Sequence, residues 1–539
     1  MFKKGMLAAG AFMLAVSATN VQTVQAETKV EATQDAEGRK ILQKFLSSGF
    51  ALDFKLTFGS VKYNKATGEI IATDVGFTLP NMKANYKKIM VSGYKADPAA
   101  ETYSMDKLLL SDFSGTVAPF TDGFSIDRFE YSGISGSYEK GFMSVENATG
   151  SGMKLALPNA PDLSKIKISM SGMKVTNLNE MAKSQKEMMT LFQKPIQPGT
   201  PMPPELLKYL SMVYSNISWE KASVTGFPDL PAPDGQGSFK IGEFFMGKIS
   251  KGVLEEITLK DLSVDKPNDP VVTAIKLGKF SILGFDMLGF IQHSSTFTPG
   301  TQPTPEQSAK FLQFIKGFSI KGVDVKGPDQ ELTGEADISW GNFVGLFPTK
   351  INWDAHSIIA APKGASASRG YAAFLQMTGL DKLDIKSSMG IEWNEKNNTI
   401  VIQPFKYDAK KLAEVEFSAS IGNVTKEMLE ERDMGKLGIM ALGSNVGTIT
   451  LKVSDKGAQK LADEATKGMW SAMSAEFAAD PELQPVIENI TKLLNEPGSK
   501  LTIVLKPKGT MSFAQVSGAI ALGPKMLPTL FDIETSLEK

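Results

Sequence analysis

Apolar and polar residues alternate along most of the chain. Between Ile41 and about Leu178 this period of two appears in short runs such as 51–58, 69–72 and 165–170. Successive side chains of a β-strand point to opposite faces of a sheet, so alternation predicts antiparallel strands with one buried face. Glycine closes the polar segments 64–68, 121–123 and 139–141, where a turn needs a positive φ. The pattern predicts a meander of hairpins.

A recurring phrase runs through the first two thirds of the chain. An alternating strand of about six residues is followed by a small residue and a second short apolar pair, at 124–134, 254–264, 275–285 and 314–323. One interpretation is a long, curved sheet whose apolar face is extended strand by strand. The other is an ordinary meander that reuses one turn type, because the copies lack the fixed period of a repeat array.

Helical spacing of apolar residues interrupts the strands. It predicts helices over 179–192, over 203–214 after a proline start, and over about 305–315, where Thr304 and Gln307 have capping-box spacing. The proline-rich segment 194–204 predicts a stiff connector between the first two helices. In region 455–495 we expect a helical hairpin, its first helix capped by Asp455, before a strand over 500–506.

Five regions follow from these patterns. Residues 1–26 resemble a cleaved signal peptide, with Lys3 and Lys4 before an apolar run and Ala26 at a signal-peptidase site. Residues 27–40 are polar and predict a flexible leader. A β-meander region with a helical insertion is expected over 41–225, a middle β region over 226–365, and a C-terminal α+β domain over 366–539. Alternation in that last domain predicts strands over 389–393, 399–403 and 415–420. The predicted fold class is mainly β, all-β to α+β: extended antiparallel curved sheets or a β-groove, with inserted helices and a C-terminal helical hairpin.

Composition narrows the classes of function. The chain has 58 basic and 59 acidic side chains, so no overall field draws it to nucleic acid. It has no cysteine, which excludes disulfides, thiolate metal sites and a lipid-modified cysteine. No later apolar run approaches about 18 residues, so we expect a soluble product without a transmembrane anchor after signal cleavage.

The sequence carries no recognisable catalytic motif. Its only histidines are His293 and His356. Asp354 and His356 would point to one side of a strand, but a surface turn is the simpler interpretation of 352–356. There is no nucleophile elbow, phosphate-binding loop or zinc-binding helix motif. We therefore assign no catalytic, cofactor-binding or metal-binding residues, and we expect neither a cofactor nor an enzyme.

Two parts of the chain resemble known proteins. The last hundred residues, with a strand over 447–453, the turn 455–457, and 496–503 leading to Lys506-Pro507, resemble the tails of exported proteobacterial envelope proteins of unknown function. The recurring strand phrase resembles AsmA-like envelope proteins. That resemblance implies a long β-groove that handles lipid, although such proteins commonly keep the N-terminal anchor that cleavage after Ala26 would remove.

Three functions remain open at this stage. The chain has 26 Met and 32 Phe against 10 Tyr and 5 Trp, and flexible methionine suits a surface for varied apolar partners, although these residues equally suit packing within a curved sheet. The first hypothesis is a periplasmic, soluble, envelope-associated protein that binds or transfers lipid or another amphiphile. The alternatives are a structural or assembly scaffold with envelope-protein partners and no ligand, and a hydrolase with an unrecognised acidic site. Export beyond the periplasm to the exterior is the alternative location.

Overall fold

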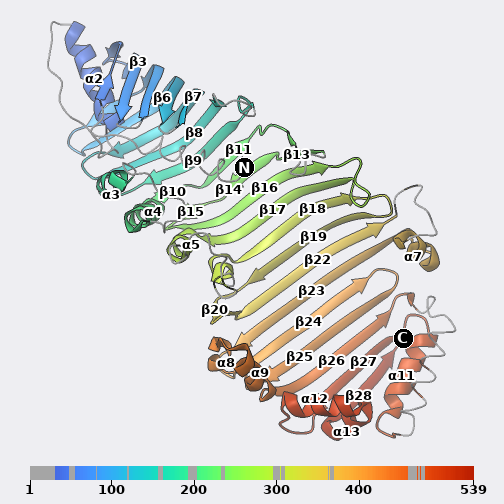
Figure 1. The fold of residues 1–539 in the computed structure, drawn as a ribbon. Coiled ribbons are helices and arrows are strands. Elements are labelled where there is room, and N and C mark those ends of the chain that lie inside the picture. Colours follow the sequence, from blue (N-terminus) through green and yellow to red (C-terminus); the bar gives the residue numbers. More distant parts are fainter. Residues whose placement is uncertain are drawn as a thin grey trace. The chain divides into compact units, whose positions relative to one another are not determined.

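The computed structural model describes residues 31–47, 55–79, 82–117, 120–155, 162–191, 203–231, 237–294, 304, 307, 310–361, 363, 370–458, 470, 474 and 480–539. This part of the chain is mainly β, with a large antiparallel sheet that is not closed and several helices (Figure 1). The expected fold class is therefore confirmed. The expected signal peptide, 1–26, lies outside the described residues.

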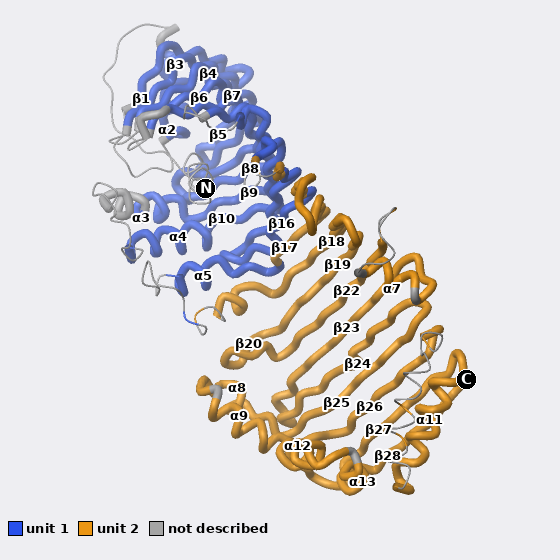
Figure 2. The backbone as a smooth tube through the Cα atoms, turned by 45° about the vertical axis from the view of Figure 1, so that its right-hand side comes forward, with its two compact units in different colours: residues 1–230, 240–261, 283–304 blue, residues 231–239, 262–282, 305–539 orange. Residues whose placement is uncertain are grey.

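The chain divides into two compact units, coloured separately in Figure 2. Unit 1 comprises residues 1–230, 240–261 and 283–304, and unit 2 comprises residues 231–239, 262–282 and 305–539. The boundary expected at 226 lies near Leu230, where the first segment of unit 1 ends. The boundary expected at 365 falls within unit 2.

Unit 1 is an antiparallel meander, and four described helices pack against or beside it. Its strands run in chain order as β1 (Lys55–Thr57), β2 (Ser60–Asn64), β3 (Glu69–Leu79), β4 (Met82–Ser92), β5 (Lys95–Asp97), β6 (Thr102–Val117), β7 (Phe120–Ser137), β8 (Phe142–Leu155), β9 (Lys167–Val175), β10 (Ile217–Ser218), β11 (Lys221–Thr225), β14 (Glu243–Met246) and β15 (Ile249–Ser250). Helices α2 (Glu31–Ser47), α3 (Leu178–Leu191) and α4 (Pro204–Asn216) accompany them, with α5 (Met287–Ser294) beside α4. Strands β16 (Val253–Asp265) and β17 (Ala274–Asp286) contribute residues to both units, and β12 (Leu230–Pro231) and β13 (Ser238–Lys240) are short.

The apolar face of unit 1 is a closed core. Ile70, Val75 and Ile89 are fully buried, and Leu42 of α2 and Met181 of α3 belong to the same cluster. Burying aliphatic side chains of this size stabilises the fold by about 1.5–3 kcal/mol each. The helices predicted over 179–192 and 203–214 are confirmed as α3 and α4.

The flexible leader expected over 27–40 is a wrong prediction for residues 31–40. They form the first part of α2, while residues 27–30 lie outside the described part. Leu42 is 0% exposed, and the Asp35 carboxylate accepts a hydrogen bond from the backbone N–H of Tyr63 on β2 at 3.2 Å. The helix is held by this tertiary contact, which a polar local sequence does not reveal.

The recurring phrase has a structural cause. Each copy contains one residue with positive φ just before its second apolar pair: Gly133 at 61°, Asp261 at 50°, Gly284 at 61° and Gly322 at 62°. A positive φ also occurs within other strands, at Asp74, Asp112, Gly152 and Gly172. A left-handed residue suits glycine and, less often, Asp or Asn, because a Cβ there crowds the following carbonyl.

This break shifts the alternation by one residue and keeps apolar side chains on one face. On β6, Leu108 and Leu110 are two residues apart and Phe113 follows three later, yet all three are buried in one core. Without Asp112 at a φ of 51°, that spacing would turn Phe113 to the opposite face. The phrase therefore marks a repeated strand irregularity.

The strands of unit 2 are also antiparallel and follow one another in chain order. They are β18 (Gly317–Lys326), β19 (Glu331–Trp340), β22 (Lys350–Ala360), β23 (Lys382–Asn394), β24 (Thr399–Ala409), β25 (Ala413–Gly422), β26 (Asn445–Asp455), β27 (Lys500–Pro507) and β28 (Phe531–Glu538), with a separate small hairpin of β20 (Phe343–Val344) and β21 (Phe347–Pro348). Each long strand pairs antiparallel with the next in this order.

The helices of unit 2 gather near the strand ends (Figure 1). They are α7 (Gly370–Thr378), α8 (Lys426–Glu430), α9 (Met434–Leu442), α11 (Gln484–Asn495), α12 (Phe513–Leu522) and α13 (Leu527–Leu530). A small cluster around Trp393 packs α8 and α9 against the sheet, and another around Phe531 packs α12 and α13 against it. No helix among the described residues is both long and apolar enough to cross a bilayer.

The expected C-terminal hairpin is seen in part. Its second helix is α11, and Trp470, one of two described residues of the preceding helical segment, donates from Nε1 to Thr491 Oγ1 at 2.9 Å. The rest of that segment lies outside the described residues. Of the helix expected over about 305–315, residues 307, 310 and 311 are helical and Leu312–Phe314 form a 3-10 helix, while 305, 306, 308 and 309 lie outside the described part. Asp455 ends β26, and its carboxylate accepts hydrogen bonds from the N–H groups of Gly457 and Gly498. The helix that we expected it to cap begins outside the described residues, so its role as a cap stays a prediction.

Candidate functional site

The register of unit 2 sorts its side chains into two chemically different faces. Phe405 on β24 is paired with Phe417 on β25, which is paired with Leu451 on β26. One residue along, Lys406 is paired with Glu416, which is paired with Lys452. Cross-strand partners share a face, so one side of the sheet is apolar and the other is charged.

The apolar side is only partly covered. We call it the open apolar face and define it by the partly or fully exposed side chains of β22–β26 on that side. These are Ile351, Trp353, Ile385, Met389, Ile391, Ile400, Ile402, Phe405, Tyr407, Val415, Phe417, Ile421, Ile449, Leu451 and Val453. Among the described residues of these strands, the apolar side chains buried on this face are Trp393 and Ala409, both near strand ends.

The contrast with unit 1 lies in what covers the sheet. In unit 1 the side chains of α2, α3 and α4 join the core beneath them. In unit 2, α11 packs over β27 and β28, where Asn489 Nδ2 donates to Thr535 Oγ1 at 3.1 Å. The described helices therefore leave the middle of β22–β26 accessible, and Trp353 is 36% exposed. An accessible apolar surface on a sheet is a candidate binding region.

A few polar groups border the open apolar face. Trp353 Nε1 donates to Ser387 Oγ at 3.2 Å on the neighbouring strand. The ring of Tyr371 on α7 lies tilted beside the ring of Phe374, and burial raises the pKa of the Tyr371 phenol, with a smaller contribution from Tyr407. The Tyr371 hydroxyl is buried without a hydrogen-bond partner among the described residues. Such a group calls for an explanation, since most buried hydroxyls are satisfied.

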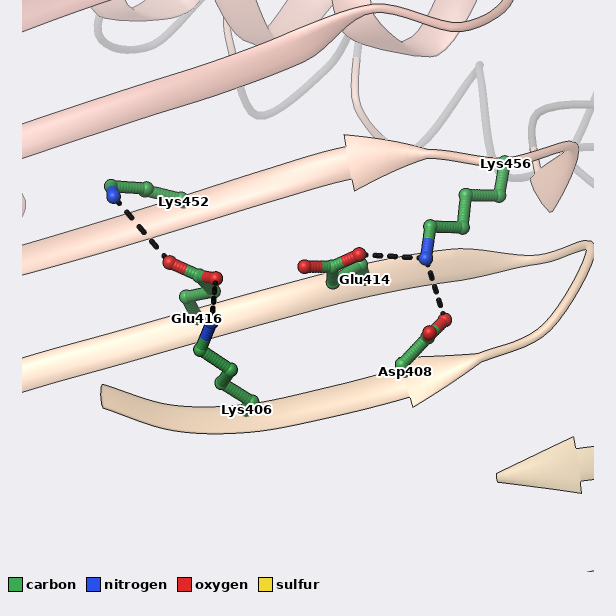
Figure 3. Close-up of polar contacts among 6 residues, drawn as sticks. All are labelled: Lys406, Asp408, Glu414, Glu416, Lys452 and Lys456. Carbon is green, nitrogen blue, oxygen red and sulfur yellow. Dashed lines mark hydrogen bonds and ion pairs between the residues drawn. The ribbon is translucent and has the colours of Figure 1, made fainter. Parts of the chain in front are cut away.

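The charged side carries paired ions, shown in Figure 3. Glu416 lies between Lys406 at 2.8 Å and Lys452 at 3.4 Å, and Lys456 lies between Asp408 at 2.8 Å and Glu414 at 2.6 Å. The Lys406 ammonium lowers the pKa of the Glu416 carboxyl, and the hydrogen bonds that Lys456 donates to Asp408 and Glu414 raise the pKa of Lys456. This side is a solvated surface whose charges neutralise one another.

The histidine expected in a surface turn lies instead within strand β22. His356 Nε2 is 2.8 Å from Asp384 Oδ1 on β23, and Lys410 is 3.8 Å from the other oxygen. The hydrogen bond with His356 lowers the pKa of Asp384. Asp354 follows the same side, as the spacing predicts for a strand, and is paired with Asp337 and Ser388. His293 belongs to α5 of unit 1. The described residues contain no group of three or more His, Asp or Glu side chains placed to hold a metal.

Unit 1 contains a small apolar hollow. Phe129, Tyr131, Gly150, Met170 and Met173 line it, and its volume is about 10 Å³. Ligand pockets commonly occupy about 300–1,000 Å³. The hollow is smaller than that, so we place the candidate site on the open apolar face.

Comparison with known proteins covers one part of unit 2. A model of a family described only as an uncharacterised protein matches residues 406–537, from the second half of β24 through β28. This is under half of the chain. No curated protein matches it.

The sequence predicted that this face of the sheet is apolar, but it did not predict that the face is exposed. Runs such as 389–393, 399–403 and 415–420 were expected as strands, and they lie in β23, β24 and β25. The signal for a shared face was present in the alternation, but alternation is the same for a covered and an uncovered sheet. Helix α12 also escaped prediction, although Ser512 and Gln515 form a capping box.

Proposed function

We propose that this chain binds or transfers a lipid or another amphiphile on the open apolar face of unit 2. The observation that carries the proposal is the accessible, continuous set of Phe, Tyr, Trp, Met and Ile side chains over β22–β26. Displacing water from such a surface is favourable by roughly 25 cal/mol per Å² of apolar area. A long acyl chain supplies apolar area without polar groups that would need partners on the sheet.

The charged side supports the same proposal. The paired lysines and carboxylates of this side stay in water, while the opposite face of the same sheet would contact the acyl chain. The unsatisfied Tyr371 hydroxyl borders the open apolar face and is a candidate partner for the polar end of an amphiphile. A scaffold without a ligand would instead be expected to pack this face against its own helices.

The proposed location is the periplasm, where a signal peptide over 1–26 would deliver the chain. Export leaves a mature protein that begins after Ala26. N-terminal sequencing of the protein from cell-envelope fractions tests this step. An intact Met1 terminus in a cytoplasmic fraction would contradict it.

The first experiment asks whether the full chain, purified without detergent, carries lipid. Native mass spectrometry should detect a bound mass, and organic extraction should release a phospholipid or another acyl compound. A clean unliganded mass that stays unchanged after incubation with phosphatidylglycerol and phosphatidylethanolamine vesicles would overturn the proposal.

A matched pair of variants locates the site. Phe417→Asp places a charge on the open apolar face, while Ser418→Asp places the same charge on the opposite side of β25. We expect Phe417→Asp to weaken uptake of a fluorescent phospholipid by at least about tenfold, since a buried unpaired carboxylate is costly. Ser418→Asp should bind like the unmodified chain. Equal effects of the two variants, with both folded by circular dichroism, would contradict the assignment of the face.

A further inference from the structure

The last strand of unit 2 has one open side. β28 pairs with β27 over eight residues, from Lys500 with Glu538 to Pro507 with Phe531, without a register shift. Among the described strands, β28 pairs with no other. An edge strand presents a row of backbone N–H and C=O groups that another chain can pair with.

The pairing shows which backbone groups point outward. Lys508 donates its N–H to the Leu530 carbonyl at 2.8 Å, and hydrogen-bonded and non-hydrogen-bonded pairs alternate along an antiparallel ladder. Pro507, which has no N–H, then falls in a non-hydrogen-bonded pair with Phe531. Continuing the alternation turns the N–H and C=O groups of Ile533, Thr535 and Leu537 away from β27.

The chain treats an edge of unit 1 differently. Strand β2 pairs with β3, and helix α2 lies against β2, where Asp35 accepts the N–H of Tyr63. Natural proteins also block edges with lysine, proline or bulges. β28, whose sequence is FDIETSLE, has none of these. It is a regular edge of alternating apolar and mostly acidic residues.

The charges of β28 select among partners. Asp532, Glu534 and Glu538 lie on one face, with side chains 65%, 58% and 68% exposed. Toward β27 they meet Lys508, Lys506 and Lys500. On the outer side an antiparallel second copy of β28 would place acids opposite acids, which is destabilising. A strand with basic residues at alternate positions would match both the backbone groups and the charges.

We propose that the outer edge of β28 binds an extended segment of a partner protein whose alternate side chains are lysine or arginine. The segment adds a strand to the sheet, with its basic side chains beside Asp532, Glu534 and Glu538. Its remaining side chains lie on the apolar side of the sheet. The inference does not depend on what occupies the open apolar face.

Synthetic β-hairpins test the inference against the full chain. One hairpin has an outer strand that alternates lysine and valine, and the other has glutamate in place of lysine. Fluorescence anisotropy at low ionic strength should show the lysine hairpin binding at least about tenfold more tightly, since several cross-strand charge pairs change sign between the two. Binding of neither hairpin, or equal binding of both, would overturn the proposal.

Variants place the hairpin on β28. The neutral triple variant Asp532→Asn, Glu534→Gln, Glu538→Gln should lose most of the preference for lysine, while Glu392→Gln on the interior strand β23 should keep it. Leu537→Pro removes one outward N–H and should weaken the lysine hairpin. A preference that survives the triple variant, or self-association of the chain in sedimentation that the hairpin does not displace, contradicts the inference. If Leu537→Pro unfolds, the triple variant still decides.

Discussion

The carboxylate of Asp455, at the end of β26, accepts a hydrogen bond at 3.0 Å from the backbone N–H of Gly498, 43 residues later in the chain. Its other oxygen accepts the N–H of Gly457 at 3.1 Å. The single side chain therefore ties the end of one strand to the turn before β27. This contact brackets the segment that precedes the last two strands of unit 2.

Loss of the two hydrogen bonds to Asp455 should lower the stability of the chain. We expect Asp455→Ala to lower the free energy of unfolding by about 1–3 kcal/mol, because two backbone donors lose a charged acceptor. Asp455→Asn, which keeps one acceptor oxygen, should have a smaller effect. Urea unfolding followed by circular dichroism gives both values, and an unchanged midpoint for Asp455→Ala would contradict the prediction.

The positive φ in the recurring phrase predicts how two substitutions at Gly322 rank by the stability that they cost. Gly322→Val should lower the free energy of unfolding by about 1–2 kcal/mol, because a branched side chain at a φ of 62° is strained. Gly322→Asp should cost less, since Asp261 holds the same conformation in another copy. An added Cβ meets only Gly278, at 3.4 Å, so crowding does not explain the difference.

A glycine in a helix provides the control for that series. Gly438 lies in α9, and an added Cβ has no atom within 4 Å. Gly438→Ala should raise the free energy of unfolding by about 0.5–1 kcal/mol. Equal costs for Gly322→Val and Gly322→Asp in urea unfolding would refute the conformational explanation of the phrase.

The ion pairs around Glu416 predict a pH dependence. Hydrogen bonding to Lys406 lowers the folded-state pKa of this carboxyl below its ordinary value of 4.5. The stabilisation is therefore present above about pH 4.5 and is lost as pH falls through the lowered folded-state value. Glu416→Gln should reduce the urea midpoint at pH 7, and its difference from the unmodified chain should shrink below pH 4.

An exposed glutamate of α11 serves as the control for this measurement. Glu488→Gln should leave the urea midpoint nearly unchanged at both pH values. A difference for Glu416→Gln that is the same at pH 7 and pH 3 would show that its effect is steric and not electrostatic.

Helix α2 predicts a stability role for the segment before the sheet. Leu42→Ala should destabilise the chain by about 2–5 kcal/mol, because it leaves a cavity in the closed core of unit 1. Lys40→Ala, on an exposed position of the same helix, should change little. Thermal unfolding and limited proteolysis within α2 report both variants. Equal protease sensitivity of Leu42→Ala and the unmodified chain would show that α2 contributes no protection.

Local patterns predicted strands and helices whose signals lie within a few residues. Alternation located β23, β24 and β25, and apolar spacing located α3, α4 and α11. The polar residues before Ile41 contain no such signal, and α2 forms there because Leu42 and Asp35 find partners on strands that come later in the chain. The hydrogen bond from Gly498 to Asp455 gave no local signal either, because the two residues are 43 positions apart in the chain.

What the sequence by itself determined is the division of the sheet into two faces. Alternation, together with the glycines and aspartates that adopt a positive φ, settles which side chains share a face of the sheet. Both are properties of the local backbone. Only the tertiary structure decided that the apolar face is buried beneath α2, α3 and α4 in unit 1 and accessible over β22–β26 in unit 2. Whether a helix covers a face depends on contacts between distant segments, and the period of a strand is identical in both cases.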